Sequence, residues 1–243
     1  MELATYLEQK EFKMSIRSYI IYVKDNAKSE EYANVCLKSC KNSGFDAELF
    51  EGVQRSTLKY WDDKLNNLQT MENSRAYGHS LDTAQRYETK KSCFLNHVRL
   101  WQKCVELEKP ISILEHDSYC IQNWNDLEFD ELLILNITSA FNQKVFRGLQ
   151  TQVQSIDWGF GLNNYTQSPL IYTKNINFKG GLMMPGTAAY AVTPKGAKRL
   201  LSHLHLGWEQ SDYYINTKSV NIQYILPENF TFKLPNLRMS HGL

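Results

Sequence analysis

The sequence predicts an α/β protein: a single domain in which a mostly parallel central sheet is flanked by helices. An apolar, β-branched segment at residues 16–23 precedes a helical pattern and then a second apolar segment at 47–53. This β-α-β order is typical of a parallel sheet. No linker, repeat or low-complexity tract interrupts the 243 residues. We therefore expect one domain over residues 16–226, an N-terminal extension at 1–15 and a C-terminal tail at 227–243.

The first elements follow from local signals. Residues 16–23 are β-branched and aromatic, which favours a buried strand. Ser29 is a suitable N-cap, and the two glutamates after it suit the positive end of a helix dipole. Gly44 is a typical C-terminal stop for that helix. The polar segment 54–90 is less regular, with a short helix expected at 58–68.

The most periodic stretch of the chain predicts an amphipathic helix. Its apolar residues recur at positions i, i+4, i+7 and i+11, which places them on one helical face: Phe94, Val98, Trp101 and Val105. Pro110 ends the pattern, because proline cannot continue a helix without losing a hydrogen bond.

The second half predicts further short strands. We expect them at residues 110–114, 132–136, 187–192 and 220–226. Residues 141–186 are compatible with strands or with functional loops. Thr193 and Pro194 begin a helix well, because Thr is a good N-cap and Pro suits the first helical position. A short helix is expected at 212–215, and the chain after Pro227 is expected to be irregular.

Composition and charge exclude several classes of protein. Lys plus Arg is 27 and Asp plus Glu is 26, a net charge of +1 that argues against a broad phosphate-binding face. No apolar run approaches the roughly 18 residues of a membrane span, and residues 1–15 do not resemble a secretory signal. The five cysteines are irregularly spaced, which favours a reducing, cytoplasmic location. Cys36 and Cys40 lack partner ligands for zinc and are interpreted as core residues.

The strongest candidate for chemistry is the trio Glu115-His116-Asp117, which follows a buried strand directly. Ligands bind beyond the carboxyl ends of parallel strands, and carboxylates with an imidazole suit a divalent cation that could hold a diphosphate. The alternative is a solvated acidic turn. His97 lies on the helix leading to this trio, and both a structural role and a ligand role are open.

Other known motifs are missing. The sequence has no dinucleotide-binding glycine motif, no Walker lysine motif and no nucleophile-elbow serine. Four aromatic residues could stack on a sugar or a base, but strand-like spacing favours core positions for them: Trp158, Phe160, Tyr165 and Tyr172.

Three blocks resemble glycosyltransferase family 25, which includes bacterial lipooligosaccharide galactosyltransferases and collagen hydroxylysine galactosyltransferases. The first is Cys93–His97 with Trp101 and the strand ending at Asp117, similar to a G-C-x-x-S-H pattern, a Trp-bearing helix and Glu-Asp-Asp. The second is 186–201, similar to G-T-x-x-Y followed by K-G-A and a Leu-rich helix. A weaker third is Ser211-Asp212. The blocks keep their order over residues 16–225.

The resemblance implies a GT-A-type transferase that uses a nucleotide-activated sugar, UDP-linked in our expectation, with Mn²⁺ (or Mg²⁺) and inversion of configuration. The acceptor would be a hydroxyl of a saccharide or of another molecule. The residues it implicates are Asp117, His116 and Glu115 for the metal, Asp212 and then Glu209 for the general base, and Glu115, His116, His97 and Lys195 for the donor pocket.

Four positions depart from the family pattern. His116 replaces the middle acidic residue, Ser92 a glycine, Asn96 a serine and Lys90 a glutamate. An imidazole can still ligate manganese, so His116 weakens the inference of metal dependence without removing it.

Two other functions remain open from the sequence. The same fold could glycosylate a modified base in DNA, using a local groove formed by 144–147, Lys174 and Lys179; the low net charge does not favour this. The chain could also be a non-catalytic module that binds nucleotide sugars but has lost the metal through His116.

Overall fold

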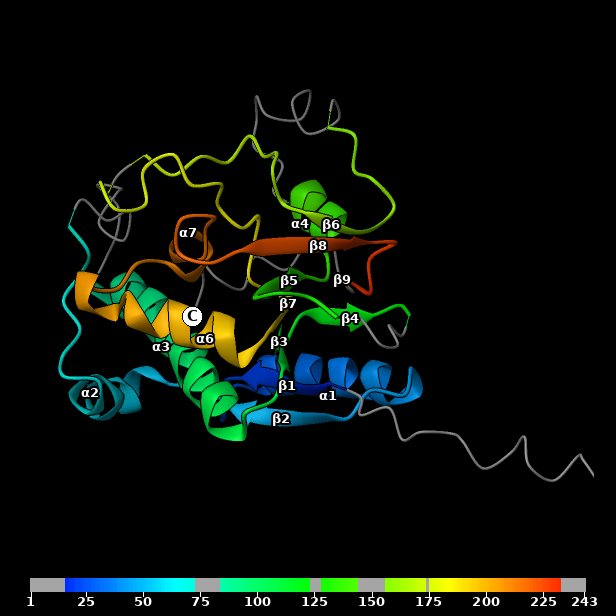
Figure 1. Cartoon of the computed structure of the whole chain (residues 1–243). Coiled ribbons are helices and arrows are strands. Elements are labelled where there is room, and N and C mark those ends of the chain that lie inside the picture. The colour runs from blue at the N-terminus through cyan, green and yellow to red at the C-terminus, as the bar shows by residue number, and fades with distance from the viewer. Residues whose placement is uncertain (1–15, 73–83, 123–127, 144–155, 174, 233–243) are drawn as a thin grey trace, which may run out of the picture.

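The computed structural model describes residues 16–72, 84–122, 128–143, 156–173 and 175–232. The strands are β1 (Arg17–Tyr22), β2 (Ala47–Glu51), β3 (Ile111–Glu115), β4 (Ser118–Cys120), β5 (Leu132–Ile134), β6 (Gly161–Asn164), β7 (Ala189–Val192), β8 (Ile222–Leu226) and β9 (Phe230–Phe232). The helices are α1 (Ala27–Asn42), α2 (Arg55–Lys64), α3 (Ala84–Leu107), α4 (Ile137–Gln143), α6 (Pro194–Ser202), the 3₁₀ turn η2 (Leu204–Leu206) and α7 (Ser211–Tyr214). Figure 1 shows their arrangement.

A seven-stranded sheet in the order β2-β1-β3-β7-β5-β8-β6 forms the centre of the molecule. β1 pairs in parallel with β2 and β3, and β5 with β8. β7 is antiparallel to both of its neighbours, and β6 is antiparallel to β8. Five strands therefore run in one direction and two in the other, which confirms the prediction of a mostly parallel sheet and of an opening β-α-β unit.

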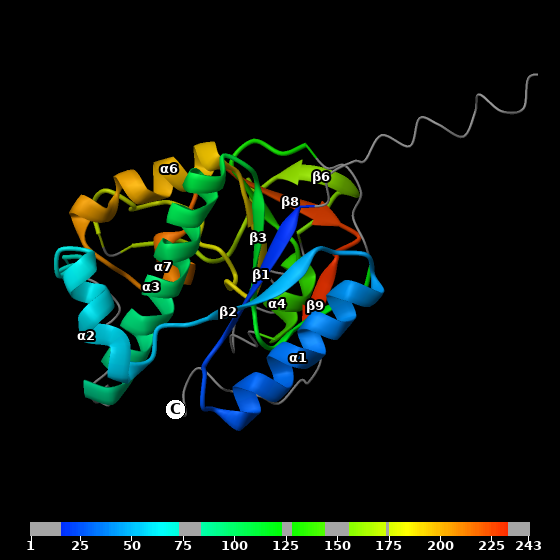
Figure 2. The same cartoon turned by 90° about the horizontal axis from the view of Figure 1, so that it is seen from below.

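Helices cover both faces of this sheet. Figure 2 shows α3 and α6 on one side and α1 on the other. The larger core lies under α3 and α6 and contains Phe94, Trp101 and Trp208, none of which is exposed to solvent. The smaller core lies under α1 and contains Cys36 and Cys40, which confirms the interpretation of these cysteines as core residues. Among the described residues, no helix is long and apolar enough to cross a membrane.

The first helix begins earlier than predicted. Asn26 is the N-cap of α1, because its Oδ1 accepts a hydrogen bond of 2.9 Å from the backbone N–H of Ser29. The Ser29 hydroxyl accepts from the N–H of Val23 instead, and so ties α1 to the end of β1. Gly44 follows the helix with a φ of 81°, as expected for a C-terminal stop.

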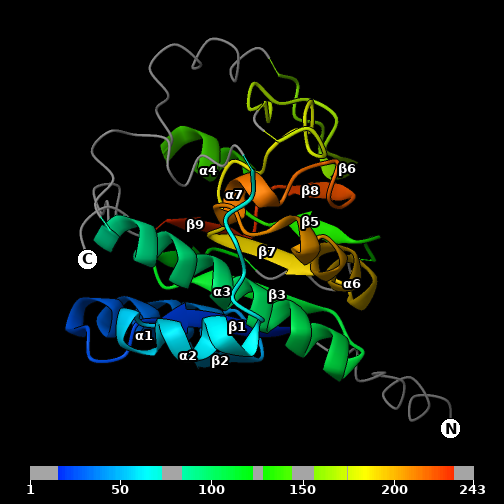
Figure 3. The same cartoon turned by 90° about the vertical axis from the view of Figure 1, so that its left-hand side faces the viewer.

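Helix α2 lies against α3 (Figure 3) and covers residues 55–64 rather than the predicted 58–68. A buried ion pair joins the two helices: Lys91 Nζ lies 2.5 Å from Asp62 Oδ2 and donates to the carbonyl of Leu68 at 2.9 Å. Because Lys91 is almost fully buried, the pair fixes where α2 sits on the long helix.

The expectation of an irregular C-terminal tail is wrong for residues 230–232. This segment is β9, which pairs with β4 antiparallel. Phe230 is completely buried and its ring lies 5.5 Å from that of Phe45 in the smaller core. Three residues are too few to show an alternating pattern in the sequence, so only tertiary packing identifies the strand.

Helix α6 begins where predicted, and its first turn packs on the backbone before β5. Thr193 is the N-cap and accepts a hydrogen bond from the Gly196 N–H at 3.1 Å. A Cβ atom at Gly196 would lie 2.2 Å from the carbonyl oxygen of Glu131. Only glycine allows this approach, which gives the Lys-Gly-Ala block a structural reason.

Replacing Gly196 with Ala is expected to destabilise the protein by about 3 kcal/mol, because either the helix or Glu131 must shift. Chemical denaturation measures the loss. Gly161→Ala is the control: its Cβ would meet nothing within 4 Å, and only the φ of 82° opposes it, a strain of about 1 kcal/mol. Equal losses in the two variants would contradict the steric explanation.

Candidate active site

The acidic trio lies at the carboxyl edge of β3. Glu115 is the last residue of the strand, and His116 and Asp117 form the turn into β4. The carbonyl of Ala188 accepts from the Glu115 N–H at 2.8 Å and from the Ser118 hydroxyl at 2.6 Å. Both ends of the turn are therefore held against the chain entering β7.

Glu115 points toward α3. Its Oε1 accepts a hydrogen bond of 2.5 Å from the Thr187 hydroxyl and lies 3.8 Å from His97 Nε2. Desolvation, together with the charge of Asp117, raises the pKa of Glu115 to about 7. The side chain is nevertheless 37% exposed. The carboxylate is therefore desolvated by its neighbours and still partly accessible to solvent.

His116 and Asp117 present a different environment. The His116 ring lies parallel to that of Tyr32 on α1, with 6.4 Å between centroids. His116 Nε2 and Asp117 Oδ1 are buried and have no hydrogen-bond partner among the described residues. Burial lowers the pKa of His116 and raises that of Asp117 to about 6.

The structure does not gather the predicted three metal ligands. Glu115 faces α3 whereas His116 faces α1, and within the described ranges no group of three His, Cys, Asp or Glu side chains is arranged to hold a metal ion. What remains is a pair, His116 and Asp117, each with one buried atom free to bind a ligand.

His97 lies beside Glu115, as the sequence suggested, and is 2% exposed. Its Nδ1 is 2.9 Å from the Tyr190 hydroxyl, which also accepts a hydrogen bond of 3.0 Å from Trp101 Nε1. Burial lowers the pKa of His97 to about 4, so the imidazole is neutral at pH 7. Tyr190 was not singled out from the sequence, although it is the Tyr of the G-T-x-x-Y block.

Asp212, in the first turn of α7, belongs to the same region. Its charge raises the pKa of Glu115, after the larger effects of burial and of Asp117. Desolvation and the charges of Glu115 and Asp212 raise the pKa of the Cys93 thiol to about 12, although Cys93 is solvent-accessible. Three elements distant in sequence, α3, β3 and α7, thus bring Cys93, Glu115 and Asp212 close to one another.

Comparison with known proteins identifies the family. The model of the family described as "Glycosyltransferase family 25 (LPS biosynthesis protein)" matches residues 16–215. The chain belongs to glycosyltransferase family 25. It is therefore a glycosyltransferase, and the resemblance of the three sequence blocks is confirmed.

No curated protein matches this family 25 chain. Among solved structures, mouse xyloside xylosyltransferase 1 in its apo form is similar, with 12% sequence identity and a TM-score of 0.38. The match covers 83% of this chain and 80% of the mouse chain.

Two residues predicted for the site of this transferase lie elsewhere. Glu209 is completely buried, and its carboxylate accepts from the Tyr172 hydroxyl at 3.2 Å and the Gln210 N–H at 2.8 Å, which leaves it no access to an acceptor. Lys195 follows β7, whose end is paired with the start of β3. It binds Asp130 at 2.6 Å, at the sheet edge opposite the trio. A donor-pocket role for Lys195 disagrees with this placement.

The aromatic candidates are mostly core residues, as expected. Tyr165 and Tyr172 are buried and Trp158 packs against the larger core. Phe160 is the exception: it is 84% exposed, so the prediction of a core position is wrong for it. Of the basic residues considered for DNA binding, 144–147 and Lys174 lie outside the described residues, and Lys179 is exposed.

Asn96, where the family pattern has Ser, has a structural role. It is 4% exposed, and its Oδ1 accepts a hydrogen bond of 2.5 Å from the Val53 N–H. The side chain therefore ties α3 to the chain leaving β2.

Proposed function

We propose that this family 25 transferase moves a sugar from a nucleotide-sugar donor, UDP-linked in the first instance, to a hydroxyl of a saccharide or another acceptor on a GT-A-type scaffold. The observation that carries the proposal is the proximity of Glu115 and Asp212, two acidic side chains from segments nearly a hundred residues apart. Desolvated acidic side chains at the carboxyl edge of a sheet are suited to binding and catalysis.

The residues present fit a divalent cation. Asp117 Oδ1 and His116 Nε2 are buried without partners, and carboxylate and neutral imidazole are both ligands for Mn²⁺. Two protein ligands suffice, because such cations are commonly held by one or two protein groups together with substrate phosphates. When bound there, Mn²⁺ (or Mg²⁺) would neutralise charge on the diphosphate leaving group.

Glu115 is placed to bind the donor rather than the cation. Its Oε1 is occupied by the Thr187 hydroxyl and faces His97. The Glu115 side chain is still 37% exposed. In this proposal its carboxylate accepts a hydrogen bond from a hydroxyl of the donor, which orients the sugar.

Asp212 is the proposed general base. It is only half-buried, so an acceptor can reach its carboxylate. The carboxylate takes the proton of the acceptor hydroxyl as the acceptor oxygen forms a bond to the anomeric carbon. The bond from that carbon to the nucleoside diphosphate breaks and the diphosphate leaves with its electron pair. Attack opposite the leaving group inverts the anomeric configuration.

A thermal-shift panel tests donor and metal together. UDP-, GDP- and CMP-linked sugars are each mixed with the protein in Mn²⁺, in Mg²⁺ and in EDTA. A donor at a hundred times its Kd stabilises the fold by about 2.7 kcal/mol, a rise in Tm of roughly 5–10 °C for a chain of this size. We expect a UDP-linked sugar to give this rise with Mn²⁺ and most of it to disappear in EDTA.

Asp117→Asn is expected to remove the Mn²⁺-dependent part of that shift. Asp46→Asn, an exposed aspartate that precedes β2 at the opposite sheet edge, is the control and is expected to keep it. No shift with any donor would refute the donor assignment. A metal-independent shift without transfer or donor hydrolysis would instead favour a non-catalytic binding protein.

A further inference from the structure

Four polar side chains from three elements make successive contacts that run from the larger core to Glu115. Trp101 Nε1 is 3.0 Å from the Tyr190 hydroxyl, and that hydroxyl is 2.9 Å from His97 Nδ1. On the other side of the ring, His97 Nε2 is 3.8 Å from Glu115 Oε1. Trp101, Tyr190 and His97 are almost completely buried, so protein groups and not bulk water determine where their hydrogens lie.

The positions of these hydrogens follow from the chemistry of the groups. An indole N–H only donates, so the Tyr190 oxygen accepts from Trp101. The hydroxyl then needs an acceptor for its own hydrogen, because an unpaired buried donor is costly. His97 Nδ1 is the acceptor that the described residues offer. A neutral imidazole carries one hydrogen, which must therefore lie on Nε2, the nitrogen that faces Glu115.

We infer that Tyr190 is a positioning residue, which holds His97 as the Nε2–H tautomer so that the imidazole presents an N–H, and not a lone pair, to the Glu115 carboxylate. The consequence for the donor rests on the proposed function. The Thr187 hydroxyl donates to Oε1 and the His97 N–H faces the same oxygen from 3.8 Å, so both groups favour one orientation of the carboxylate toward the donor.

The Nδ1–H tautomer of His97 would make unfavourable contacts with both Glu115 and Tyr190. Nε2 would then direct its lone pair at a carboxylate oxygen 3.8 Å away, which is a repulsive contact in a desolvated environment. Both Nδ1 and the Tyr190 oxygen would also carry hydrogens at their 2.9 Å contact, with no described acceptor for the hydroxyl. The low pKa of His97 agrees with this assignment, because a neutral ring is required for it.

The tautomer is measured directly by ¹⁵N NMR of histidine-labelled protein without donor or metal, at a pH above 8, where Glu115, whose pKa is raised to about 7, is a carboxylate and His97 is neutral. The His97 signals are assigned by their loss in His97→Gln. We expect Nδ1 to resonate as an unprotonated ring nitrogen and Nε2 as a protonated one. The reverse pattern in the unaltered protein would overturn the inference, and this result needs no known substrate.

Tyr190→Phe then removes only the hydroxyl. We expect the Nδ1–H tautomer to become populated and the affinity for a UDP-linked sugar to fall about tenfold, a loss typical of second-layer groups that orient a ligand-binding side chain. The matched control is Tyr165→Phe, another buried tyrosine, whose hydroxyl donates to the Met183 carbonyl at 2.9 Å. It is expected to leave both readouts unchanged.

The readouts separate this inference from the proposed function. If no UDP-linked sugar binds the unaltered protein but the tautomer changes in Tyr190→Phe as expected, the positioning role of Tyr190 holds and the donor assignment fails. If Tyr190→Phe keeps the Nε2–H tautomer and full donor affinity, the positioning role is refuted while the donor assignment holds.

Discussion

Replacing Asp212 with Asn is expected to lower kcat for sugar transfer by about 10²- to 10⁴-fold, the usual contribution of a general base. Asn has nearly the same size and cannot take the acceptor proton. Affinity for the nucleotide-sugar donor should stay nearly unchanged, because Asp212 acts on the acceptor. Steady-state kinetics with the donor found in the thermal-shift panel, together with the donor Kd by calorimetry, measure both quantities.

Asp46→Asn again serves as the control, since it removes one carboxylate at the far edge of the sheet and should keep full turnover. Near-normal turnover in Asp212→Asn would refute the assignment of the base. A parallel loss of donor affinity would instead place Asp212 among the donor-binding groups.

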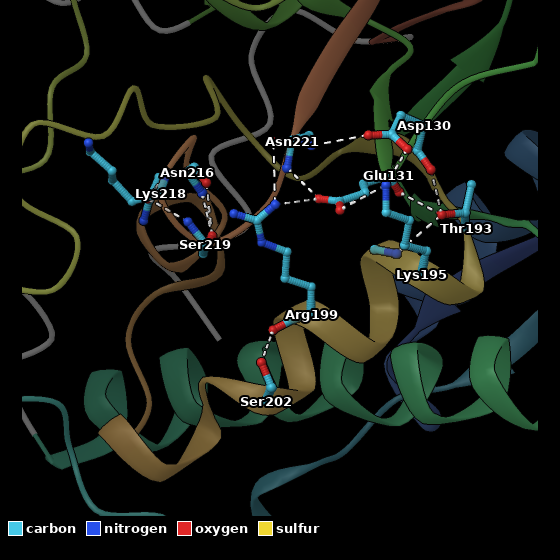
Figure 4. Close-up of polar contacts among 11 residues, drawn as sticks. Asp130, Glu131, Thr193, Lys195, Arg199, Ser202, Asn216, Lys218, Ser219 and Asn221 are labelled. Carbon is cyan, nitrogen blue, oxygen red and sulfur yellow. Dashed lines mark hydrogen bonds and ion pairs between the residues drawn. The ribbon is translucent and has the colours of Figure 1, made fainter.

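Replacing Glu131 with Ala is expected to destabilise the fold by about 2–3 kcal/mol, because a backbone N–H and a partly exposed guanidinium both lose a buried charged acceptor. Glu131 is 2% exposed; its Oε2 accepts from Arg199 Nη1 at 3.0 Å and from the Asn221 N–H at 2.7 Å (Figure 4). Its loss leaves the Asn221 N–H without this acceptor and removes the carboxylate from Arg199, whose Nη1 keeps only its weaker contact with Asn221 Oδ1 at 3.3 Å among the described residues. The expected fall in Tm is roughly 4–12 °C.

Asp130→Ala is the matched control for Glu131→Ala. Asp130 is the neighbouring carboxylate and shares Lys195 as a partner, but it is exposed. Exposed ion pairs contribute little to stability, so Tm should hardly change. Similar losses in the two variants would show that burial is not what makes Glu131 important.

The elements with strong local signals were predictable. The β-branched run at 16–23, the 3.6-residue periodicity after Phe94 and the Thr193-Pro194 helix start each specify a local structure, and the structure confirms all three. Elements stabilised by distant partners were not. The strand at 230–232 depends on pairing with β4, and Asn26 displaced Ser29 as the N-cap because Ser29 instead binds the end of β1.

The residues of the candidate site were likewise only partly predictable from the sequence. From the sequence alone, residues at the end of a predicted strand and on the helix before it could be assigned to the site, so Glu115, Asp117 and His97 were named. The direction of each side chain could not be assigned. Glu115 and His116 are adjacent in sequence but face opposite sides of the sheet, which left a pair of possible metal ligands in place of three.

The sequence by itself therefore determined the α/β class, the order of the main elements and the family, because these depend on local patterns and on conserved spacing along one chain. Tertiary structure decided which predicted residues meet. It brought Asp212 to Glu115, moved Lys195 to the far edge of the sheet and enclosed Glu209 in the core. It also placed Tyr190 on His97. For Lys195 the physical reason is that β7 runs antiparallel to β3, so the chain that follows β7 leaves the sheet at the edge opposite Glu115, and nothing in the four residues of β7 specifies that direction.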